Sequence, residues 1–181
     1  MSQIDHLDVI TLGGGCFWCT EAVFTRVKGV VKVEPGYSGG QNKNPTYAQV
    51  SRGNTGHAEV VQVSFHPTEV SLADLLKIFF MTHDPTTLNR QGADVGTQYR
   101  SVIFYHTDQQ KEIIDSVIAE LSAETLWDKP IITQVEPLQK FYKAEEYHID
   151  YFNRHRKQPY CQLVIVPKLD KLRTKFRDKV K

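Results

Sequence analysis

Residues 13–21 read GGGCFWCTE, a glycine turn that leads into two cysteines three positions apart. Residues 6–12 before it alternate as a strand does, and the apolar pattern over about residues 16–27 is typical of a helix. The stretch therefore predicts a strand, a tight turn and a helix, with Cys16 at the start of the helix. Unpaired backbone N–H groups and the positive end of the helix dipole stabilise a thiolate at such a position.

Cys16 and Cys19 have the spacing of a dithiol redox site, but that spacing also suits a metal clamp or a nucleophile with a second group beside it. Cys16 could also be a small buried apolar residue, although such a residue does not require a triple-glycine turn. A zinc site needs four ligands, and the sequence has no second close Cys/His pair. A plain dithiol-exchange protein would explain the two cysteines but not the long polar loops further along the chain.

Composition limits the class of protein. The chain has 181 residues, of which 40% are hydrophobic and 24% charged, so residues 1–181 suit one globular domain. The net charge of +1 gives no general attraction to nucleic acid or to an anionic membrane, and no apolar run reaches the roughly 18 residues of a spanning helix. The first residues lack the pattern of a signal peptide, so we expect a cytoplasmic location. Three cysteines fit free or catalytic thiols better than a disulfide framework.

Strand-like and helix-like segments alternate along the rest of the chain. The patterns predict strands at residues 30–33, 59–65, 101–105, 131–135 and 162–166, and helices at residues 72–81, 107–126 and 144–155. Residues 35–57 and 83–98 read mainly as polar loops. The segment at about 168–180 has apolar residues at helical spacing, which predicts an amphipathic basic helix with a solvated face rather than a membrane or RNA site.

Six short motifs follow one another across about residues 9–160, and their order and spacing carry the resemblance given below. They are GCFW at 15–18, GYSGG at 36–40, PTY at 45–47, GNTGHAE at 53–59, HDP at 83–85 and QGADVGTQYRS at 91–101. On these motifs the sequence resembles the peptide methionine sulfoxide reductases of type A. The resemblance implies an α/β (α+β) fold, namely a two-layer sandwich with a mixed, mainly antiparallel sheet and a ferredoxin-like core.

The resemblance also implies an activity, the thiol-dependent reduction of methionine S-sulfoxide, free or in proteins, to methionine, as repair of oxidative damage. In this chemistry a thiolate attacks the sulfoxide sulfur while a proton reaches the oxygen. Cys16 matches the family's nucleophile. Glu59 matches its acid, whose pKa must be raised, as burial near aromatic side chains would do. The attack leaves Cys16 as a sulfenic acid, which a second thiol converts into a disulfide.

Other matched positions concern the substrate. Tyr47 and Tyr99 match hydroxyl groups that hydrogen-bond the sulfoxide oxygen, and Asp94 matches a polar residue that organises the site. Phe17 and Trp18 match an apolar pocket for the substrate methyl group, where sulfur–aromatic contacts help. Without the resemblance, these side chains would read as ordinary core, surface or turn residues. The implied reductant is thioredoxin or another thiol, with no bound cofactor and no metal.

The resolving thiol is the point at which this chain leaves the commonest family pattern, because many members have Gly in place of Cys19 and a cysteine in a flexible tail. Two candidates remain. Cys19 is favoured because residues i and i+3 of a helical turn lie about 5–6 Å apart, within the range of a disulfide. Cys161 is the alternative, and it precedes the apolar run at residues 162–166 that reads as a packed strand.

Two other classes of protein stay open. One is a dithiol–disulfide exchange protein that uses Cys16 and Cys19, and the other is a non-catalytic peptide-binding module that recognises methionine through Phe17 and Trp18. For a reductase, the expected partners are oxidised proteins or free methionine sulfoxide and thioredoxin, with neither nucleic acid nor membrane. We expect a monomer.

Overall fold

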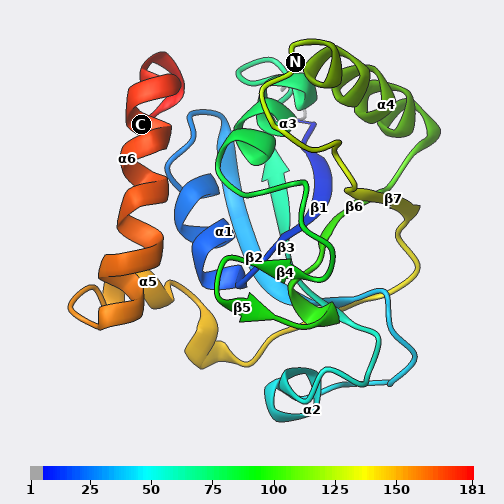
Figure 1. Cartoon of the computed structure of the whole chain (residues 1–181), viewed down its shortest axis with the longest axis vertical. Helices are drawn as coiled ribbons and strands as arrows, with labels where there is room; N and C mark the ends of the chain where they lie inside the picture. The colour runs from blue at the N-terminus through cyan, green and yellow to red at the C-terminus, as the bar shows by residue number, and fades with distance from the viewer. Residues whose placement is uncertain (1–5) are drawn as a thin grey trace, which may run out of the picture.

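The computed structural model describes residues 6–181, which form a curled six-stranded sheet with helices packed against it (Figure 1). The strands of the sheet are β1 Asp8–Gly14, β2 Val30–Ser38, β3 Ala58–Phe65, β6 Ser101–Tyr105, β7 Gln134–Pro137 and β8 Phe141–Lys143, and a separate hairpin pairs β4 Arg90–Gln91 with β5 Asp94–Val95. The helices are α1 Phe17–Phe24, α2 Tyr47–Ser51, α3 Leu72–Met81, α4 Asp108–Ala123, α5 Tyr151–Arg154 and α6 Val166–Lys175. Short 3-10 turns cover Thr97–Tyr99, Glu146–His148 and Arg177–Lys179, and a π-helical turn covers Cys161–Ile165.

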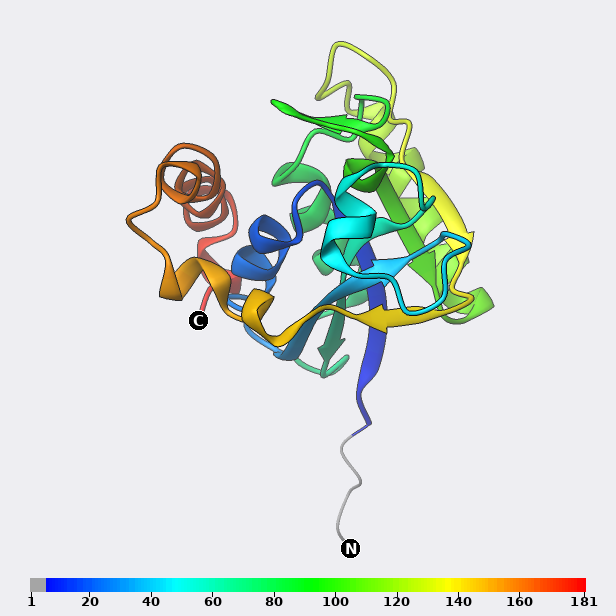
Figure 2. The same cartoon turned by 90° about the horizontal axis from the view of Figure 1, so that it is seen from below.

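The sheet has the strand order β7-β6-β1-β3-β2-β8. β1 pairs antiparallel with β3 and β6, β2 pairs antiparallel with β3 and β8, and β7 runs parallel to β6. The expected mixed, mainly antiparallel sheet is therefore confirmed. Helix α1 packs against β1, β2 and β3, and α6 packs against the outer side of α1, so that α1 lies between α6 and the sheet (Figure 2).

Alternation along β3 decides which of its side chains face the helices. Val61, Val63 and Phe65 belong to the main core cluster, together with side chains of α1 and α3, whereas Val60 belongs to a second, smaller cluster. Successive side chains of a strand point to opposite faces, so Glu59 shares the helix-covered face with Val61. Strand β3 therefore carries an acidic residue into the core beneath α1.

Local sequence signals placed several elements correctly. The Oγ of Ser71 accepts the backbone N–H of Asp74 at 3.0 Å, and α3 spans the predicted residues 72–81. The predicted strand at residues 101–105 is β6. The two regions read as loops contain more regular structure than expected, because the first holds the end of β2 and the short α2, and the second holds the β4–β5 hairpin.

The predicted strand at residues 162–166 is wrong. These residues lie in the π-helical turn Cys161–Ile165, which continues directly into α6. Leu163 is 77% exposed, whereas Cys161, Ile165 and Leu169 are buried, and a spacing of four residues between buried positions is that of a helix. The β-branched residues of this run favour a strand locally, but the burial of one helical face against the core outweighs that preference.

Two other predicted elements also differ. The predicted helix at residues 144–155 is broken into the 3-10 turn Glu146–His148 and the short α5, because Asp150 between them has a left-handed φ of 56°. The buried Glu21 of α1 holds this break in place, since its Oε2 accepts the backbone N–H of Asp150 at 3.0 Å. The predicted strand at residues 131–135 begins later, as β7 at Gln134.

The predicted basic helix at about 168–180 is α6 as far as Lys175, followed by a 3-10 turn. Val180 then forms a bridge with Val27, and the backbone N–H of Lys28 donates to the carbonyl of Lys179 at 2.7 Å. The end of the chain is thus held against the segment that follows α1. Across residues 6–181, every helix is too short or too polar to cross a membrane.

Candidate active site

Cys16 occupies the N-cap of α1, at the junction where β1 turns into the helix. Gly15 makes this turn with a φ of 99°, in the left-handed region that favours glycine. Cys16 is 8% exposed, and its carbonyl accepts the backbone N–H of Cys19 at 3.1 Å. The two predicted cysteines therefore lie in the same first turn of α1, as the spacing predicted.

Glu59 lies beneath that turn and is 1% exposed. Its Oε1 accepts the backbone N–H of Phe17 at 3.1 Å, and its Oε2 has no hydrogen-bond partner among residues 6–181. Burial raises the pKa of Glu59 to about 8; the Phe17 N–H opposes this rise, and the charges of Asp94 and Cys19 add to it. A carboxyl group in this setting holds its proton near neutral pH and is able to donate it.

Tyr47 and Tyr99 are half-buried, one at the start of α2 and the other at the end of the 3-10 turn Thr97–Tyr99. Burial raises the pKa of Tyr47 to about 12, and the charges of Glu59 and Cys16 add to the rise. The pKa of Tyr99 is raised by burial and then by the same two charges. Both hydroxyl groups therefore stay protonated near neutral pH, within electrostatic range of Cys16 and Glu59.

Phe17 and Trp18 take different positions. Phe17 is completely buried, and its ring lies 5.7 Å from that of Tyr37 and 4.9 Å from that of His148, centroid to centroid. Trp18 is half-buried and stacks on Tyr151, with the ring centroids 3.7 Å apart and the planes 5° from parallel. Its Nε1–H donates to Nδ1 of His148 at 3.0 Å. Trp18 is thus the more accessible ring of the pair, and two contacts fix its orientation.

Asp94, on β5, accepts a hydrogen bond from the hydroxyl group of Tyr160 at 2.7 Å. The same hydroxyl oxygen lies 3.6 Å from the sulfur of Cys19. Sequence reasoning did not single out Tyr160, which joins the hairpin to the cysteine turn across the chain. Its one available signal was its position directly before Cys161.

The three thiols are free, and they differ in acidity. Burial raises the pKa of Cys16, and the hydrogen bond with Cys19 and the charge of Glu59 raise it further. A backbone hydrogen bond from Trp18 at the helix start lowers the pKa, as expected from the sequence, but burial outweighs that effect. The pKa of Cys19 is lowered, first by its hydrogen bond with Cys16 and also by the positive charge of Lys168. Cys161 lies at the start of the π-helical turn and is fully buried, and burial raises the pKa of its thiol.

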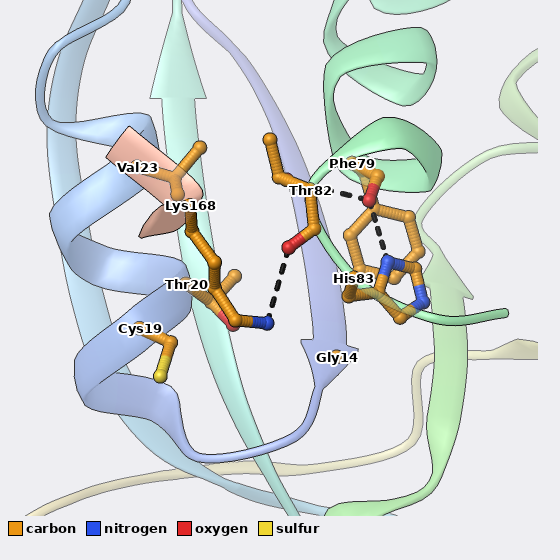
Figure 3. A pocket seen from close by; sticks show the side chains of 8 residues that line it. All are labelled: Gly14, Cys19, Thr20, Val23, Phe79, Thr82, His83 and Lys168. Atoms are coloured by element: carbon orange, nitrogen blue, oxygen red, sulfur yellow. Dashed lines mark hydrogen bonds between the residues drawn. The ribbon is translucent and has the colours of Figure 1, made fainter. Parts of the chain in front are cut away.

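Two cavities adjoin Cys19. The larger, of about 420 Å³, is lined by side chains of both cysteines of the first turn and of Asp94, Tyr160 and Lys168. The smaller, of about 10 Å³, lies between α1 and α3, and Lys168 and Cys19 both line it (Figure 3). The cysteine turn therefore has space beside it on the side of α6.

Sequence reasoning also missed two residues that hold the aromatic side chains. Glu145 accepts the backbone N–H of Tyr47 at 2.9 Å with one carboxylate oxygen and the hydroxyl of Tyr37 at 2.8 Å with the other. His148 holds Trp18, as described above. Within residues 6–181, no three His, Cys, Asp or Glu side chains gather closely enough to hold a metal ion.

Comparison with known proteins places this site in a family. A family model described as peptide methionine sulfoxide reductase matches residues 8–180, a range that includes every residue predicted above for the site. The peptide methionine sulfoxide reductase MsrA of Saccharolobus solfataricus is 55% identical over 175 residues, covering 97% of this chain and 98% of that protein. The MsrA of Trichodesmium erythraeum is 56% identical over 174 residues, covering 96% of this chain and 98% of that protein.

Solved structures agree with these sequence matches. Mxr1 from Saccharomyces cerevisiae in its reduced form is similar with a TM-score of 0.79 and 36% identity, over 89% of this chain and 92% of that one. Mxr1 in complex with Trx2 is similar with a TM-score of 0.56 and 29% identity, over 83% of this chain and 88% of that one. The chain has a buried acid beneath a helix-capping cysteine, and the family model and the relatives match it over nearly its whole length. The chain therefore belongs to the type A peptide methionine sulfoxide reductases.

Proposed function

We propose that Cys16 is the attacking thiol of a reaction that reduces methionine S-sulfoxide, in proteins or free, to methionine. The family membership carries the reaction class, an oxidoreductase that uses thiols as the source of electrons. In the first step the sulfur of Cys16 attacks the sulfoxide sulfur and the sulfoxide oxygen is protonated. Methionine leaves as the thioether, and Cys16 is left as a sulfenic acid.

Glu59 is the proposed acid, and its setting is the observation on which the proposal rests most. The carboxyl group is buried, hydrogen-bonded to the residue after Cys16, and has a pKa raised to about 8. An acid with a pKa near the working pH is protonated yet able to give up its proton in the transition state. A deprotonated Glu59 would also repel the Cys16 thiolate. The protonated form of Glu59 can therefore donate a proton and also avoids this repulsion.

Tyr47 and Tyr99 are proposed to hydrogen-bond the sulfoxide oxygen. Their raised pKa values keep both hydroxyl groups available as donors. Trp18 and Phe17 are proposed to form the apolar pocket for the methyl group. Trp18 supplies the accessible ring, and Phe17 packs behind it in the core. Asp94 is proposed to organise the site through its hydrogen bond with Tyr160.

Cys19 is proposed to resolve the sulfenic acid, with Cys161 as the alternative. Cys19 shares a helical turn with Cys16 and its pKa is lowered, so it is the more acidic partner of the pair. Cys161 is fully buried and lies in the π-helical turn Cys161–Ile165, outside the helical turn that Cys16 and Cys19 share. The reductant of the resulting disulfide is proposed to be thioredoxin or another thiol. The complex of the related Mxr1 with Trx2 supports this choice.

The proposal is tested with dabsyl-methionine S-sulfoxide and R-sulfoxide in the presence of dithiothreitol. We expect reduction of the S-epimer, and reduction of neither epimer would refute the activity. Glu59→Gln should abolish this reduction while Glu112→Gln, at an exposed site on α4, leaves it unchanged. If Glu59→Gln leaves disulfide exchange intact but stops sulfoxide reduction, simple dithiol exchange is excluded as the main function, whereas full sulfoxide reduction by Glu59→Gln would refute Glu59 as the acid.

Three further expectations from the sequence stay proposals. A ferredoxin-like core is supported by the element order β1-α1-β2-β3-α3-β6 and by the sheet order β6-β1-β3-β2 within the larger sheet. A monomeric state and a cytoplasmic location are carried forward as expectations.

A further inference from the structure

Lys168 reaches the cysteine turn from the other side of α1. It belongs to the first turn of α6, and its Nζ donates to the carbonyl oxygen of Thr82 at 3.1 Å. Figure 3 shows its side chain entering between α1 and the end of α3, with the amino group directed toward the space that Cys19 also lines. Lys168 lines the larger cavity as well, together with Cys16 and Cys19. The ammonium group is therefore anchored beside the thiol rather than free in solvent.

Tyr160 supplies a second polar contact to the same sulfur. Its hydroxyl group donates to Asp94 at 2.7 Å, and its oxygen lies 3.6 Å from the Cys19 sulfur, so the same hydroxyl hydrogen stabilises a Cys19 thiolate when it turns from Asp94 to the sulfur. The tyrosine thus stands between the thiol and the carboxylate, whose charge raises the pKa of Cys19. The ammonium group of Lys168 and the hydroxyl group of Tyr160 thus both lie near Cys19, and Tyr160 also binds the carboxylate of Asp94.

The groups that surround Cys19 come from several elements. They are Cys16, Glu59, Asp94, Tyr160, Cys161 and Lys168. His83 also lines the smaller cavity, but burial lowers its pKa to about 3, so its ring is uncharged near neutral pH. Lys168 is a positive charge that acts on Cys19, and its effect there is to lower the pKa of the thiol. Lys171 lies close by, since it lines a neighbouring cavity together with His83 and Lys168.

We propose that Lys168 and Tyr160 are positioning residues for the second step, in which they hold Cys19 as the thiolate that attacks the Cys16 sulfenic acid. This inference rests on the proposed function of Cys19 as the resolving thiol. The Cys19 sulfur forms a bond to the Cys16 sulfur, and the S–O bond of the sulfenic acid breaks. Cys19 donates an electron pair to the new S–S bond, so its sulfur rises from the thiolate to the disulfide oxidation level while the Cys16 sulfur falls from the sulfenic acid to the same level, and the departing hydroxide takes a proton from solvent to leave as water.

Cys16 and Cys19 share one helical turn but differ in acidity, and Lys168 acts on Cys19. Cys16 faces Glu59 and has a raised pKa, whereas Cys19 faces Lys168 and has a lowered one. The contacts around Cys19 therefore favour the thiolate, which is the nucleophilic form of a thiol, and those around Cys16 do not. Removal of Lys168 should slow the second step and leave the chemistry at Cys16 in place.

The first experiment titrates the Cys19 thiolate by its ultraviolet absorbance and needs no catalysis. The starting protein is the double variant Cys16→Ser, Cys161→Ser, in which Cys19 is the remaining thiol. Adding Lys168→Met should raise the midpoint by about one pH unit, so that the thiolate fraction near neutral pH falls about tenfold. Lys168→Arg should restore the midpoint, and Lys175→Met, an exposed site on the same helix, should not move it. Equal midpoints for Lys168→Met and Lys175→Met would overturn the proposal.

The second experiment measures both steps in one turnover with the three native cysteines present. Methionine release reports the first step, which converts the Cys16 thiol into a sulfenic acid, and loss of a second free thiol, called thiol loss below, reports the second step. Lys168→Met and Tyr160→Phe should each slow thiol loss about tenfold at neutral pH while methionine is still released in equimolar amount. Thiol loss at the wild-type rate in Lys168→Met would contradict the inference.

The experiments also distinguish failure of this inference from failure of the proposed function on which it rests. Absence of methionine release from the wild-type protein would refute the reductase itself, and a disulfide mapped to Cys16 and Cys161 would refute Cys19 as the resolving thiol. In both of those cases the thiolate titration still decides whether Lys168 acts on Cys19, because that measurement requires neither substrate nor turnover.

Discussion

The carboxyl group of Glu59 accepts the backbone N–H of Phe17 at 3.1 Å, which ties the middle of the sheet to the residue directly after Cys16. The contact is made from β3 to the first turn of α1, across 42 positions of the sequence. It leaves the second carboxyl oxygen of Glu59 without a partner among the described residues. The free oxygen is therefore where a proton can be held for a substrate beside Cys16.

The first prediction concerns the pH dependence of sulfoxide reduction. Because burial raises the pKa of Glu59 to about 8, the acid is protonated below that pH and loses its proton above it. The attack also needs the Cys16 thiolate, whose pKa is raised, so the single-turnover rate of methionine formation at saturating substrate should pass through a maximum with pH and fall once the pair has lost both protons. A rate without this fall at alkaline pH would show that the proton comes from another group.

The second prediction concerns stability and follows from the same shift. A carboxyl group whose pKa is higher in the folded state stabilises the fold at low pH, and this contribution is lost as the pH rises through the folded-state value of about 8. Wild type should therefore lose more stability than Glu59→Gln between about pH 6 and about pH 9. Urea unfolding of both proteins at the two pH values measures the difference. Glu21, whose pKa is raised to about 7, is common to both and cancels.

The third prediction concerns the turn before Cys16. A Cβ on Gly15 would lie 2.5 Å from Cγ of Gln91, whose amide group is held by two hydrogen bonds to the backbone of Asp84. Gly15→Ala should therefore lower the free energy of unfolding by about 1–3 kcal/mol through overpacking and strain, and lower the rate of the first step. Urea unfolding and the single-turnover assay measure both effects.

Gly92→Ala is the matched control for Gly15→Ala. Gly92 also has a left-handed φ, of 56°, but a Cβ there meets nothing within 4 Å. Gly92→Ala should therefore show the loss of stability that the left-handed backbone conformation causes by itself, without a steric clash. An equal loss of stability in the two variants would mean that the contact with Gln91 does not constrain the turn.

The fourth prediction separates the two candidates for the resolving thiol. Cys19→Ser should complete the first turnover but lose cycling supported by thioredoxin, because no acidic thiol remains in the turn with Cys16. Cys161→Ser should cycle normally. Peptide mapping of the disulfide after one turnover identifies the pair directly. Normal cycling in Cys19→Ser, with loss of cycling in Cys161→Ser, would reverse the assignment.

The sequence predicted the parts of the fold that depend on short-range signals. Helix α3 and strand β6 have the predicted bounds, because a capping serine marks one and a β-branched aromatic run marks the other. The family was also predicted correctly, since its motifs are local and kept in order. The roles of Glu59, Tyr47 and Tyr99 remain predictions that the experiments above address.

The residues that escaped prediction act through distant contacts. Tyr160 and Lys168 approach Cys19 from the residue before the π-helical turn and from α6, more than a hundred positions along the chain, and their side chains do not stand out among many tyrosines and lysines. The error at residues 162–166 hid them, because eight residues of extended strand would hold Tyr160 and Lys168 about 26 Å apart. Only the burial of Cys161, Ile165 and Leu169 against the core makes the helical period visible.

The π-helical turn at Cys161–Ile165 also bears on how insertions and deletions would be tolerated. Such a turn accommodates one residue more than a regular α-helix does, and each residue of a helix corresponds to about 100° of rotation. Tyr160 and Lys168 are eight positions apart, which in a regular α-helix is about 80° past two full turns, whereas seven residues come within about 20° of two turns. Deleting one residue within the turn should therefore leave a regular helix with both side chains still toward Cys19, whereas inserting a further residue would turn one of them away. The length of this short segment thus sets the phase between two side chains that serve one sulfur atom.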